Sequence, residues 1–514
     1  MPPPERPPRP WLHLAAFFLV AAAWALALPA NGTYDEKDHI ARAYAVLTGQ
    51  LTPSHTVVDR RDDVKPAFLV PASLLPPNAN VDCPWSPRPA RSAACQHWSA
   101  DHTRVLTPSG AARYSPAYYL LVGAPLVAAP DLTGIVLSRL LSALAAAALL
   151  AGAVGAALRL GSRLLAVGVA LVSTPMTADL AGSVNPNGLE IAAGVAACSA
   201  LLALVRAPDD RLDDRAARRL LTLTAVASLV LLTVRQLGPA LLALIVLACA
   251  ALARPGRLRA LLRRPAAWWT VAAWGAGLAV SVGWWEYSGL TQVAAVPRDA
   301  QHLPPARITW LLTTWRIPFY LKQLVGQFGY GETSPPPLTV IAWYALLAAV
   351  VLPCLWYGTR RLLLATAGLG AGCLALLVAL ELHYLPVIGW FAHGRYAMPA
   401  AAGVVLCAAS AGQFERHLAA RLRLRRYCTT LVTAAGALHV FTLAFVMTRF
   451  RAGPVAWPSP FEGQWTPPLG PLVPLLAVAA GVTMLALLSS APSRRYGILL
   501  RPARTPWGPP VPVG

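Results

Sequence analysis

Stretches of about 20 apolar residues recur from one end of this chain to the other, and they constrain its fold more than any other feature. A helix of that length crosses a bilayer core, and a helix satisfies its own backbone polar groups where no water is present. Of the 514 residues, 56% are hydrophobic and only 13% are charged, whereas soluble domains carry about 25% charged residues. The chain is therefore predicted to be all-α, a polytopic transmembrane helical bundle.

Hydropathy and the positions of the arginines together predict about twelve spans. They lie near residues 11–30, 133–157, 164–181, 187–206, 220–234, 237–253, 266–285, 337–357, 361–380, 395–411, 428–449 and 471–490. Residues 116–130 are short, bounded by proline and aromatic at their start, which favours an interfacial or re-entrant helix over a further span.

The net charge of +21 comes largely from arginine clusters in short loops, such as those at 215–219, 254–264 and 421–426. Short cytoplasmic loops of membrane proteins are rich in Lys and Arg, and a cytoplasmic N-terminus places all of these clusters on that side. The sequence thus predicts a multi-pass protein of the cell membrane with both termini in the cytoplasm. Nucleic acid is not an expected partner, and neither is ATP, because no Walker loop is present.

This topology divides the chain into a cytoplasmic tail at 1–10, a transmembrane domain at 11–490 and a Pro-rich cytoplasmic tail at 491–514. Two outer segments, 31–132 and 286–335, are too long to be simple connectors, and long loops usually carry function. We expect both segments to hold interfacial helices.

Two of the eight cysteines, Cys83 and Cys95, lie in the first outer segment. The other six lie in or beside apolar runs, where a free cysteine behaves as a small core residue. An oxidising outer compartment would allow Cys83 and Cys95 to pair in a disulfide.

A run of ionisable residues at 34–39 directly follows the first apolar stretch. Asp35 and Glu36 suit the N-terminal end of a helix, with His39 one turn beyond Asp35, so a capped helix with a local ion pair explains them. The alternative is chemistry at the membrane surface, with Asp35 and Glu36 as catalytic general base or as ligands of Mg²⁺ or Mn²⁺. No histidine spacing matches a zinc site.

Further candidates lie near the predicted outer edge of the membrane. Tyr118 and Tyr119 could stack on a sugar or a prenyl chain, although an aromatic belt also accounts for them. Asp179 lies near the end of a span, where a buried acid is costly. Asn185 and Asn187 follow it in a short turn, for which these residue types are also structural choices.

Arg395 opens a predicted span on the outer side, between His393 and Tyr396. An arginine at a helix mouth could clamp a phosphate bidentately with help from His393. Snorkelling of an arginine at the end of a span is the simpler structural explanation.

Six short motifs occur in an order that resembles one family. They are Asp35-Glu36, Lys65-Pro66, Pro116 to Tyr119, Asn185 to Gly188, Phe328 to Gly331 and Gly394 to Pro399. The chain resembles, over roughly residues 11–490, the bacterial membrane-protein family called domain of unknown function 2142. That family in turn resembles the GT-C superfamily of polytopic glycosyltransferases, so a GT-C-like fold is expected.

The resemblance implies transfer of a sugar from a polyprenyl-phosphate donor, carried in membrane lipid, to a cell-envelope glycan acceptor on the outer face. An acid in the first outer loop acts as base or metal ligand in such enzymes, and Asp35 or Glu36 would take that role. Cations would neutralise the leaving phosphate. The candidates for this are Lys65, Arg113, Arg235 and Arg395.

The chain departs from the family pattern at two positions. Tyr34 replaces a proline before the acidic pair, and Asn187 replaces an aspartate in the Asn-Pro turn. The second change removes a potential metal ligand. Two other functions remain open on the sequence alone, a transporter or flippase of a glycolipid and a non-catalytic protein of envelope assembly. The absence of a visible internal repeat and the one-sided placement of polar residues favour an enzyme over a transporter.

Overall fold

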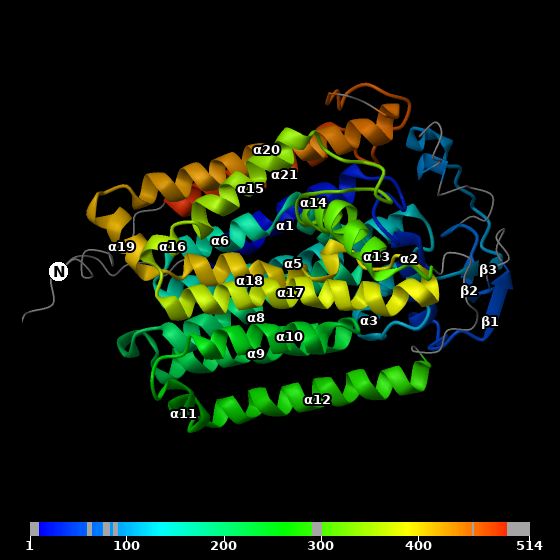
Figure 1. The fold of residues 1–514 in the computed structure, drawn as a ribbon. Coiled ribbons are helices and arrows are strands. Elements are labelled where there is room, and N and C mark those ends of the chain that lie inside the picture. The colour runs from blue at the N-terminus through cyan, green and yellow to red at the C-terminus, as the bar shows by residue number, and fades with distance from the viewer. Residues whose placement is uncertain are drawn as a thin grey trace, which may run out of the picture.

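A computed structural model describes residues 10–58, 64–75, 83–85, 91–289, 301–454 and 457–490. The predicted tail at 491–514, nearly all of the tail at 1–10 and parts of both long outer segments lie outside these residues. Long helices run roughly alongside one another, and the ends of the bundle differ in structure (Figure 1).

Nine helices in the described part of the chain are long and apolar enough to cross a membrane. They are α1 (Pro10–Ala27), α5 (Leu132–Leu160), α8 (Pro186–Arg206), α9 (Asp214–Val234), α12 (Pro265–Ser288), α15 (Pro337–Val351) continued by α16 (Cys354–Tyr357), α17 (Arg360–Ile388), α20 (Leu424–Ala452) and α21 (Leu472–Ser490).

The other three predicted spans are also helical but are broken or short. α6 (Arg163–Val172) and α7 (Pro175–Ala181) form one apolar pair bent by 67°. The bend has a local cause, since Pro175 cannot donate a helical hydrogen bond and Thr174 caps the new helix by accepting from the Thr177 amide. α10 (Gly238–Ala251) and α18 (Met398–Ala409) are shorter apolar helices.

Helix α8 forms the centre of the bundle, because 94% of its most apolar window is buried. Its small residues allow close packing, as in other membrane helices. A side chain at Gly194 would place Cβ only 2.2 Å from the Pro399 carbonyl oxygen at the start of α18. By contrast, only 22% and 17% of the corresponding windows of α12 and α21 are buried, so these two helices lie at the periphery.

The first outer segment contains a small sheet, which the sequence analysis did not predict. β1 (His55–Val58), β2 (Val64–Pro71) and β3 (Arg104–Pro108) pair antiparallel in the order β1-β2-β3, with Phe68 opposite Thr107. The strands are short, and Pro66 and Pro71 weaken their strand signal. The sheet packs on α2 (Glu36–Leu47) at one end of the bundle (Figure 1).

The remaining short elements cap the two ends. Residues 116–130 form two short helices, α3 (Ala117–Val122) and α4 (Ala124–Ala128), and not a span. The arginine-rich loops carry η3 (Asp209–Arg211), α11 (Arg257–Leu262) and α19 (Gly412–Ala420). In Figure 1, α11 and α19 lie at the end of the bundle opposite to α2 and the sheet.

The second outer segment forms a continuous helical stretch, α13 (Pro305–Leu311), the π-turn η4 (Leu312–Arg316) and α14 (Ile317–Val325). Arg316 at the end of the π-turn is buried and pairs with Glu381 of α17. Glu381 also accepts from the Tyr320 hydroxyl at 2.6 Å. The buried ion pair therefore anchors this amphipathic helix to the bundle.

Candidate functional site

The site is built around Asp35, which precedes α2 at the end of the bundle that bears the sheet. Its backbone is left-handed, with φ 59° and ψ 10°, and its side chain makes no capping bond to α2. Instead Oδ2 accepts from Arg395 Nη2 at 2.6 Å. Arg395 belongs to η5 (Gly394–Tyr396), which follows α17. The predicted acid and the predicted phosphate clamp thus form one ion pair.

The two partners of this pair differ in access to solvent. The Asp35 side chain is 37% exposed, whereas that of Arg395 is only 3% exposed. Nε and Nη1 of Arg395 are buried and have no hydrogen-bond partner in the described structure. Leaving such donors unpaired costs about 1–3 kcal/mol each.

The charges around Asp35 keep its carboxyl group ionised. Burial raises the pKa of Asp35, but the charge of Arg395 and its hydrogen bond outweigh that effect and lower the pKa to about 2. The nearby histidines are neutral, because burial lowers the pKa of His39 to about 3 and that of His393 well below its usual value. The local electrostatics therefore consist of one carboxylate and surrounding guanidinium groups.

The neutral histidines are held by fixed partners. His39 Nδ1 lies 2.8 Å from the Tyr119 hydroxyl. His393 Nδ1 lies 3.0 Å from Gln323 Nε2, and Gln323 Oε1 accepts from the Gly394 amide at 2.7 Å. Gln323 of α14 therefore ties the second outer segment to the turn that carries Arg395.

Glu36, the second predicted catalytic acid, has a different environment. It is fully buried and forms a bidentate pair with Arg139 of α5, at 2.7 Å and 2.6 Å. Oε1 also accepts from the Val184 amide at 3.1 Å. Arg139 in addition donates to carbonyl groups at the end of α1. This network gives Glu36 a structural role, so only Asp35 remains as the candidate base.

The donor set around Asp35 does not fit a divalent cation. Both oxygens of Glu36 face Arg139, and Oδ2 of Asp35 faces Arg395, so each carboxylate already has a cationic partner. The described residues include no group of three His, Cys, Asp or Glu side chains that could hold a metal ion. The two carboxylates therefore do not act as a joint metal site.

A second arginine reaches the same region. Arg235, at the end of α9, lies over the Tyr396 ring at 4.7 Å, and Arg395 lies over that ring at 5.6 Å. Arg235 Nη1 is 3.4 Å from Glu190 Oε2, and its buried Nε has no partner in the described part of the chain. Glu190 also accepts from Asn187 Nδ2 at 3.0 Å. Sequence reasoning missed Glu190, an acid within the apolar run of α8.

The Asn-Pro turn supports the backbone that carries Asp35. Asn185 Nδ2 donates to the Tyr34 carbonyl at 2.8 Å, while its Oδ1 caps α8 by accepting from the Asn187 amide. Asp179 is fully buried and accepts from the Thr33 hydroxyl at 2.7 Å. These predicted residues therefore position the turn between α1 and α2.

The loop at Phe328 to Gly331 covers Tyr34. The Tyr330 ring lies 5.9 Å from the Tyr34 ring, and Arg395 lies 4.1 Å from the centroid of Tyr34 on its way to Asp35. A Cβ atom at Gly331 would lie 2.4 Å from the Tyr34 hydroxyl, and the φ of Gly331 is +99°. Glycine is therefore needed at this position.

Three predicted residues have other surroundings. Arg113 donates to the Gly289 carbonyl at 2.6 Å, beyond the end of α12. Lys65 lies exposed on β2. The buried Tyr118 hydroxyl donates to Ser142. These contacts of Arg113 and Tyr118 do not involve Asp35.

Cys83 and Cys95 form a disulfide that links η1 (Cys83–Trp85) to η2 (Ala93–Cys95). Arg449 of α20 donates to the Pro84 and Arg91 carbonyl groups, which both belong to the loop that this disulfide closes. The disulfide therefore lies against the end of a spanning helix and not in the Asp35 site.

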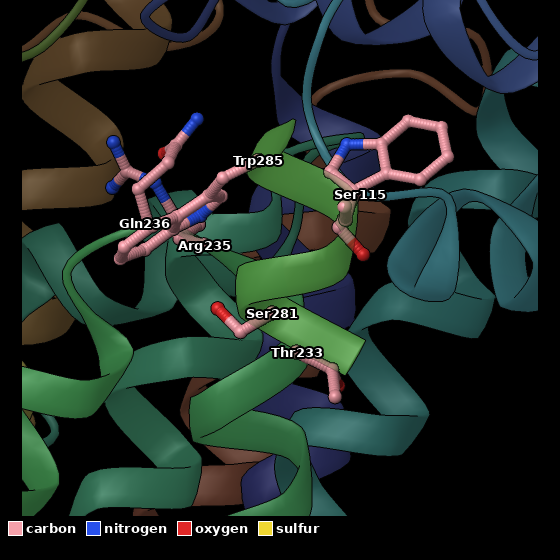
Figure 2. A pocket seen from close by; sticks show the side chains of 7 residues that line it. Ser115, Thr233, Arg235, Gln236, Ser281 and Trp285 are labelled. Carbon is pink, nitrogen blue, oxygen red and sulfur yellow. The ribbon is translucent and has the colours of Figure 1, made fainter. Parts of the chain in front are cut away.

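A small pocket, with room for about one water molecule, lies beside Arg235. Figure 2 shows side chains from α12, from the end of α9 and from the loop before α3 around it. The lining residues are Ser115, Thr233, Arg235, Gln236, Ser281, Trp284 and Trp285. Among these residues only Arg235 is a candidate from the sequence.

Comparisons with known proteins give a family and two weak structural similarities. The family model "Predicted membrane protein (DUF2142)" matches residues 18–404. Comparison with curated proteins finds no match. The structure of ArnT from Cupriavidus metallidurans bound to undecaprenyl phosphate has 13% identity and a TM-score of 0.40, covering 93% of this chain and 75% of that one. The apo structure of ArnT has 12% identity and a TM-score of 0.41, covering 91% and 73%. Similarity at this level carries neither fold nor activity over to this chain.

Proposed function

We propose that this chain, which belongs to the DUF2142 family of predicted membrane proteins, is a GT-C-type glycosyltransferase. It would move a sugar from a polyprenyl-phosphate donor to a cell-envelope acceptor. The observation that supports this most directly is the Asp35–Arg395 pair, in which a partly exposed carboxylate meets a buried guanidinium with two unpaired N–H groups. In this proposal the site opens to the outer face of the cell membrane, both termini are cytoplasmic, and residues 11–490 form the catalytic domain.

Arg395 and Arg235 would bind the donor phosphate. Charge-assisted hydrogen bonds from guanidinium to phosphate are strong and are often bidentate. Arg395 offers Nε and Nη1, and Arg235 offers Nε, all three buried and without a partner in the described structure. These groups would stabilise the negative charge that develops on the leaving phosphate.

Asp35 would act as the general base. The acceptor hydroxyl oxygen attacks the anomeric carbon and its proton passes to Asp35. The bond from that carbon to the phosphate oxygen breaks, and its electron pair stays on the polyprenyl phosphate beside Arg395. A single carboxylate and direct displacement predict inversion at the anomeric carbon.

Donor binding would also activate the base. With a pKa of about 2, Asp35 is a weak base. The charge of Arg395 lowers this pKa, whereas burial of Asp35 raises it. A phosphate that takes up the charge of Arg395 weakens this pairing and raises the pKa of Asp35. The resting ion pair thus keeps the base inactive until the donor is bound.

The test is transfer by the full-length protein in lipid nanodiscs, supplied with polyprenyl-phosphate-linked sugars and a lipid extract as acceptor. Asp35→Asn should abolish transfer, since the amide cannot accept the proton. Asp101→Asn serves as the control, because Asp101 is an exposed acid of the same outer segment. Transfer at the wild-type rate by Asp35→Asn would disprove the proposed function.

A further inference from the structure

Arg235 already has a carboxylate partner before any phosphate binds to it. Its Nη1 lies 3.4 Å from Glu190 Oε2, and the Glu190 side chain is only 1% exposed. We propose that Glu190 competes with the phosphate for Arg235 and thereby sets how readily the spent polyprenyl phosphate leaves the site. This inference rests on the proposed function and adds a step to it, the release of the lipid product.

Two other buried ion pairs show the geometry of a purely structural pair. Glu36 meets Arg139 through both of its oxygens, at 2.7 Å and 2.6 Å. Glu381 accepts from Arg316 Nε at 2.7 Å through one oxygen and from the Phe391 amide at 2.9 Å through the other. Every carboxylate oxygen in these two pairs therefore has a partner at hydrogen-bond distance.

The Glu190–Arg235 pair is different, because it is long and leaves atoms of both partners without a hydrogen bond. Beyond the single contact at 3.4 Å, Glu190 Oε1 and Arg235 Nε are buried and have no partner in the described structure. A buried polar atom without a partner is costly, and a guanidinium carries donors on more than one edge. Arg235 can therefore bind a phosphate through Nε while Nη1 still faces Glu190.

The Glu190 carboxylate is held in place from a second side. Asn187 Nδ2 donates to Glu190 Oε2 at 3.0 Å, and the same nitrogen donates to the Arg395 carbonyl at 3.4 Å. Asn187 and Glu190 both belong to α8, the central helix of the bundle. The negative charge of Glu190 is therefore tied to a buried helix and to the turn that carries Arg395, and it stays there when a phosphate arrives.

The charge of the lipid phosphate changes in the proposed reaction. The donor is a phosphodiester with a single negative charge. Once the bond to the anomeric carbon has broken, the product is a phosphate monoester with a charge of about −1.5 to −2 at pH 7. Arg395 and Arg235 therefore attract the product more strongly than the donor, and a site made of these two cations alone would retain it.

The Glu190 carboxylate offsets this retention. Repulsion between two charges is proportional to each of them, so Glu190 disfavours the product about twice as strongly as the donor. Product release limits the rate of many enzymes. Glu190 thus weakens phosphate binding most at the stage at which the lipid has to leave.

Binding of two synthetic probes tests this role without any transfer. Farnesyl phosphate, a monoester, stands for the product, and methyl farnesyl phosphate, a diester, stands for the donor. Their dissociation constants are measured on the full-length protein in phosphatidylcholine nanodiscs. Glu190→Gln should bind the monoester roughly tenfold more tightly than the wild type and the diester roughly threefold more tightly, because half the charge halves the repulsion energy.

Two further variants accompany this measurement. Glu190→Asp keeps the charge but draws it back toward α8 by one methylene, so it should bind the monoester roughly threefold more tightly than the wild type. This variant decides the question if Glu190→Gln does not fold, because it leaves Arg235 with a counter-charge. Asp101→Asn removes an exposed acid of the first outer segment and should leave both dissociation constants unchanged.

The transfer assay separates this role from a structural one. Glu190→Gln should lower both kcat and the KM for the donor, since the product leaves more slowly and the donor binds more tightly. Loss of a merely structural contact would raise this KM or leave it unchanged. Added farnesyl phosphate should inhibit Glu190→Gln at lower concentrations than it inhibits the wild type.

Weaker or unchanged binding of the monoester by Glu190→Gln and Glu190→Asp would overturn the inference, and so would an equal gain for monoester and diester. If the wild type transfers sugar and both variants bind the monoester as it does, the enzyme stands and the role of Glu190 is refuted. If the wild type transfers nothing and Glu190→Gln still binds the monoester more tightly, the enzyme is refuted and Glu190 remains the residue that limits affinity for a lipid phosphate.

Discussion

Asp35 Oδ2 and Arg395 Nη2 lie 2.6 Å apart although 360 residues separate them in the sequence. The acid follows the first spanning helix, and the arginine precedes the short helix α18. Between them, Tyr34 lies under the guanidinium at 4.1 Å. An ion pair that joins two such distant segments ties them together at one end of the bundle.

Arg395→Lys should reduce kcat/KM for transfer by roughly 100-fold, the usual effect of removing one donor that stabilises developing negative charge. Lysine keeps the charge but lacks the planar fork that binds phosphate bidentately. Arg264→Lys is the matched control, because Arg264 pairs with an exposed aspartate at 2.8 Å near the arginine-rich end. A rate for Arg395→Lys within about twofold of wild type would count against the assigned role.

Glu36→Gln should lower the free energy of unfolding, because Glu36 has a structural role. It leaves Arg139 buried without its carboxylate, a change that costs about 3–5 kcal/mol. The thermal midpoint and the membrane abundance of the protein should both fall, whereas Glu462→Gln, at an exposed position, should change neither. Replacing both Glu36 and Arg139 by leucine should recover part of the loss. A Glu36→Gln variant as stable as the wild type would show that the pair is not an anchor.

Stability should also fall in acid because of Asp35. The pKa of Asp35 is lowered from 3.8 to about 2, so the ionised form stabilises the folded state above pH 4. This contribution is lost as the pH falls from about 4 to about 2. Thermal midpoints measured over that range should decline less steeply in Asp35→Asn than in the wild type. Coincident curves for the two proteins would show that ionised Asp35 does not stabilise the folded state.

Gly331→Ala should destabilise the loop that covers Tyr34. Its Cβ would meet the Tyr34 hydroxyl at 2.4 Å, and a φ of +99° is strained for alanine by about 1–3 kcal/mol. Tyr34→Phe in the same chain should relieve the clash but not the strain, so the thermal midpoint should recover only in part. Gly275→Ala in α12 has no atom near its Cβ and should be neutral or slightly stabilising. An unchanged thermal midpoint for Gly331→Ala would show that Gly331 does not lie against the Tyr34 hydroxyl.

Local patterns in the sequence predicted much of this structure. Each predicted apolar segment contains a helix, and residues of four predicted motifs meet around Tyr34 and Asp35, because the spans bring their ends to one side of the bundle. Lys65, one of the predicted cations, lies on a sheet that was not predicted. The β2–β3 pairing there joins residues that lie far apart in the sequence, such as Phe68 and Thr107, and local periodicity carries no signal for such a partner.

Arg139 and Glu190 show where such reading fails. Both lie inside apolar runs, and their partners Glu36 and Arg235 are 103 and 45 residues away. No local spacing indicates either pairing. Ionisable residues within spans are expensive and usually have a function, so a search for charges inside the apolar runs would have found both residues without identifying their partners.

The left-handed backbone at Asp35 restricts what can replace this residue. Asparagine and glycine tolerate that conformation, whereas branched or bulky side chains resist it. Asn is therefore a nearly isosteric replacement that removes the charge and keeps the left-handed backbone. Glu would place a longer side chain on the same strained backbone. In a randomised library at this codon, Asn and Gly should preserve the fold best, and most other residues should lose a further ~1–3 kcal/mol of stability to backbone strain.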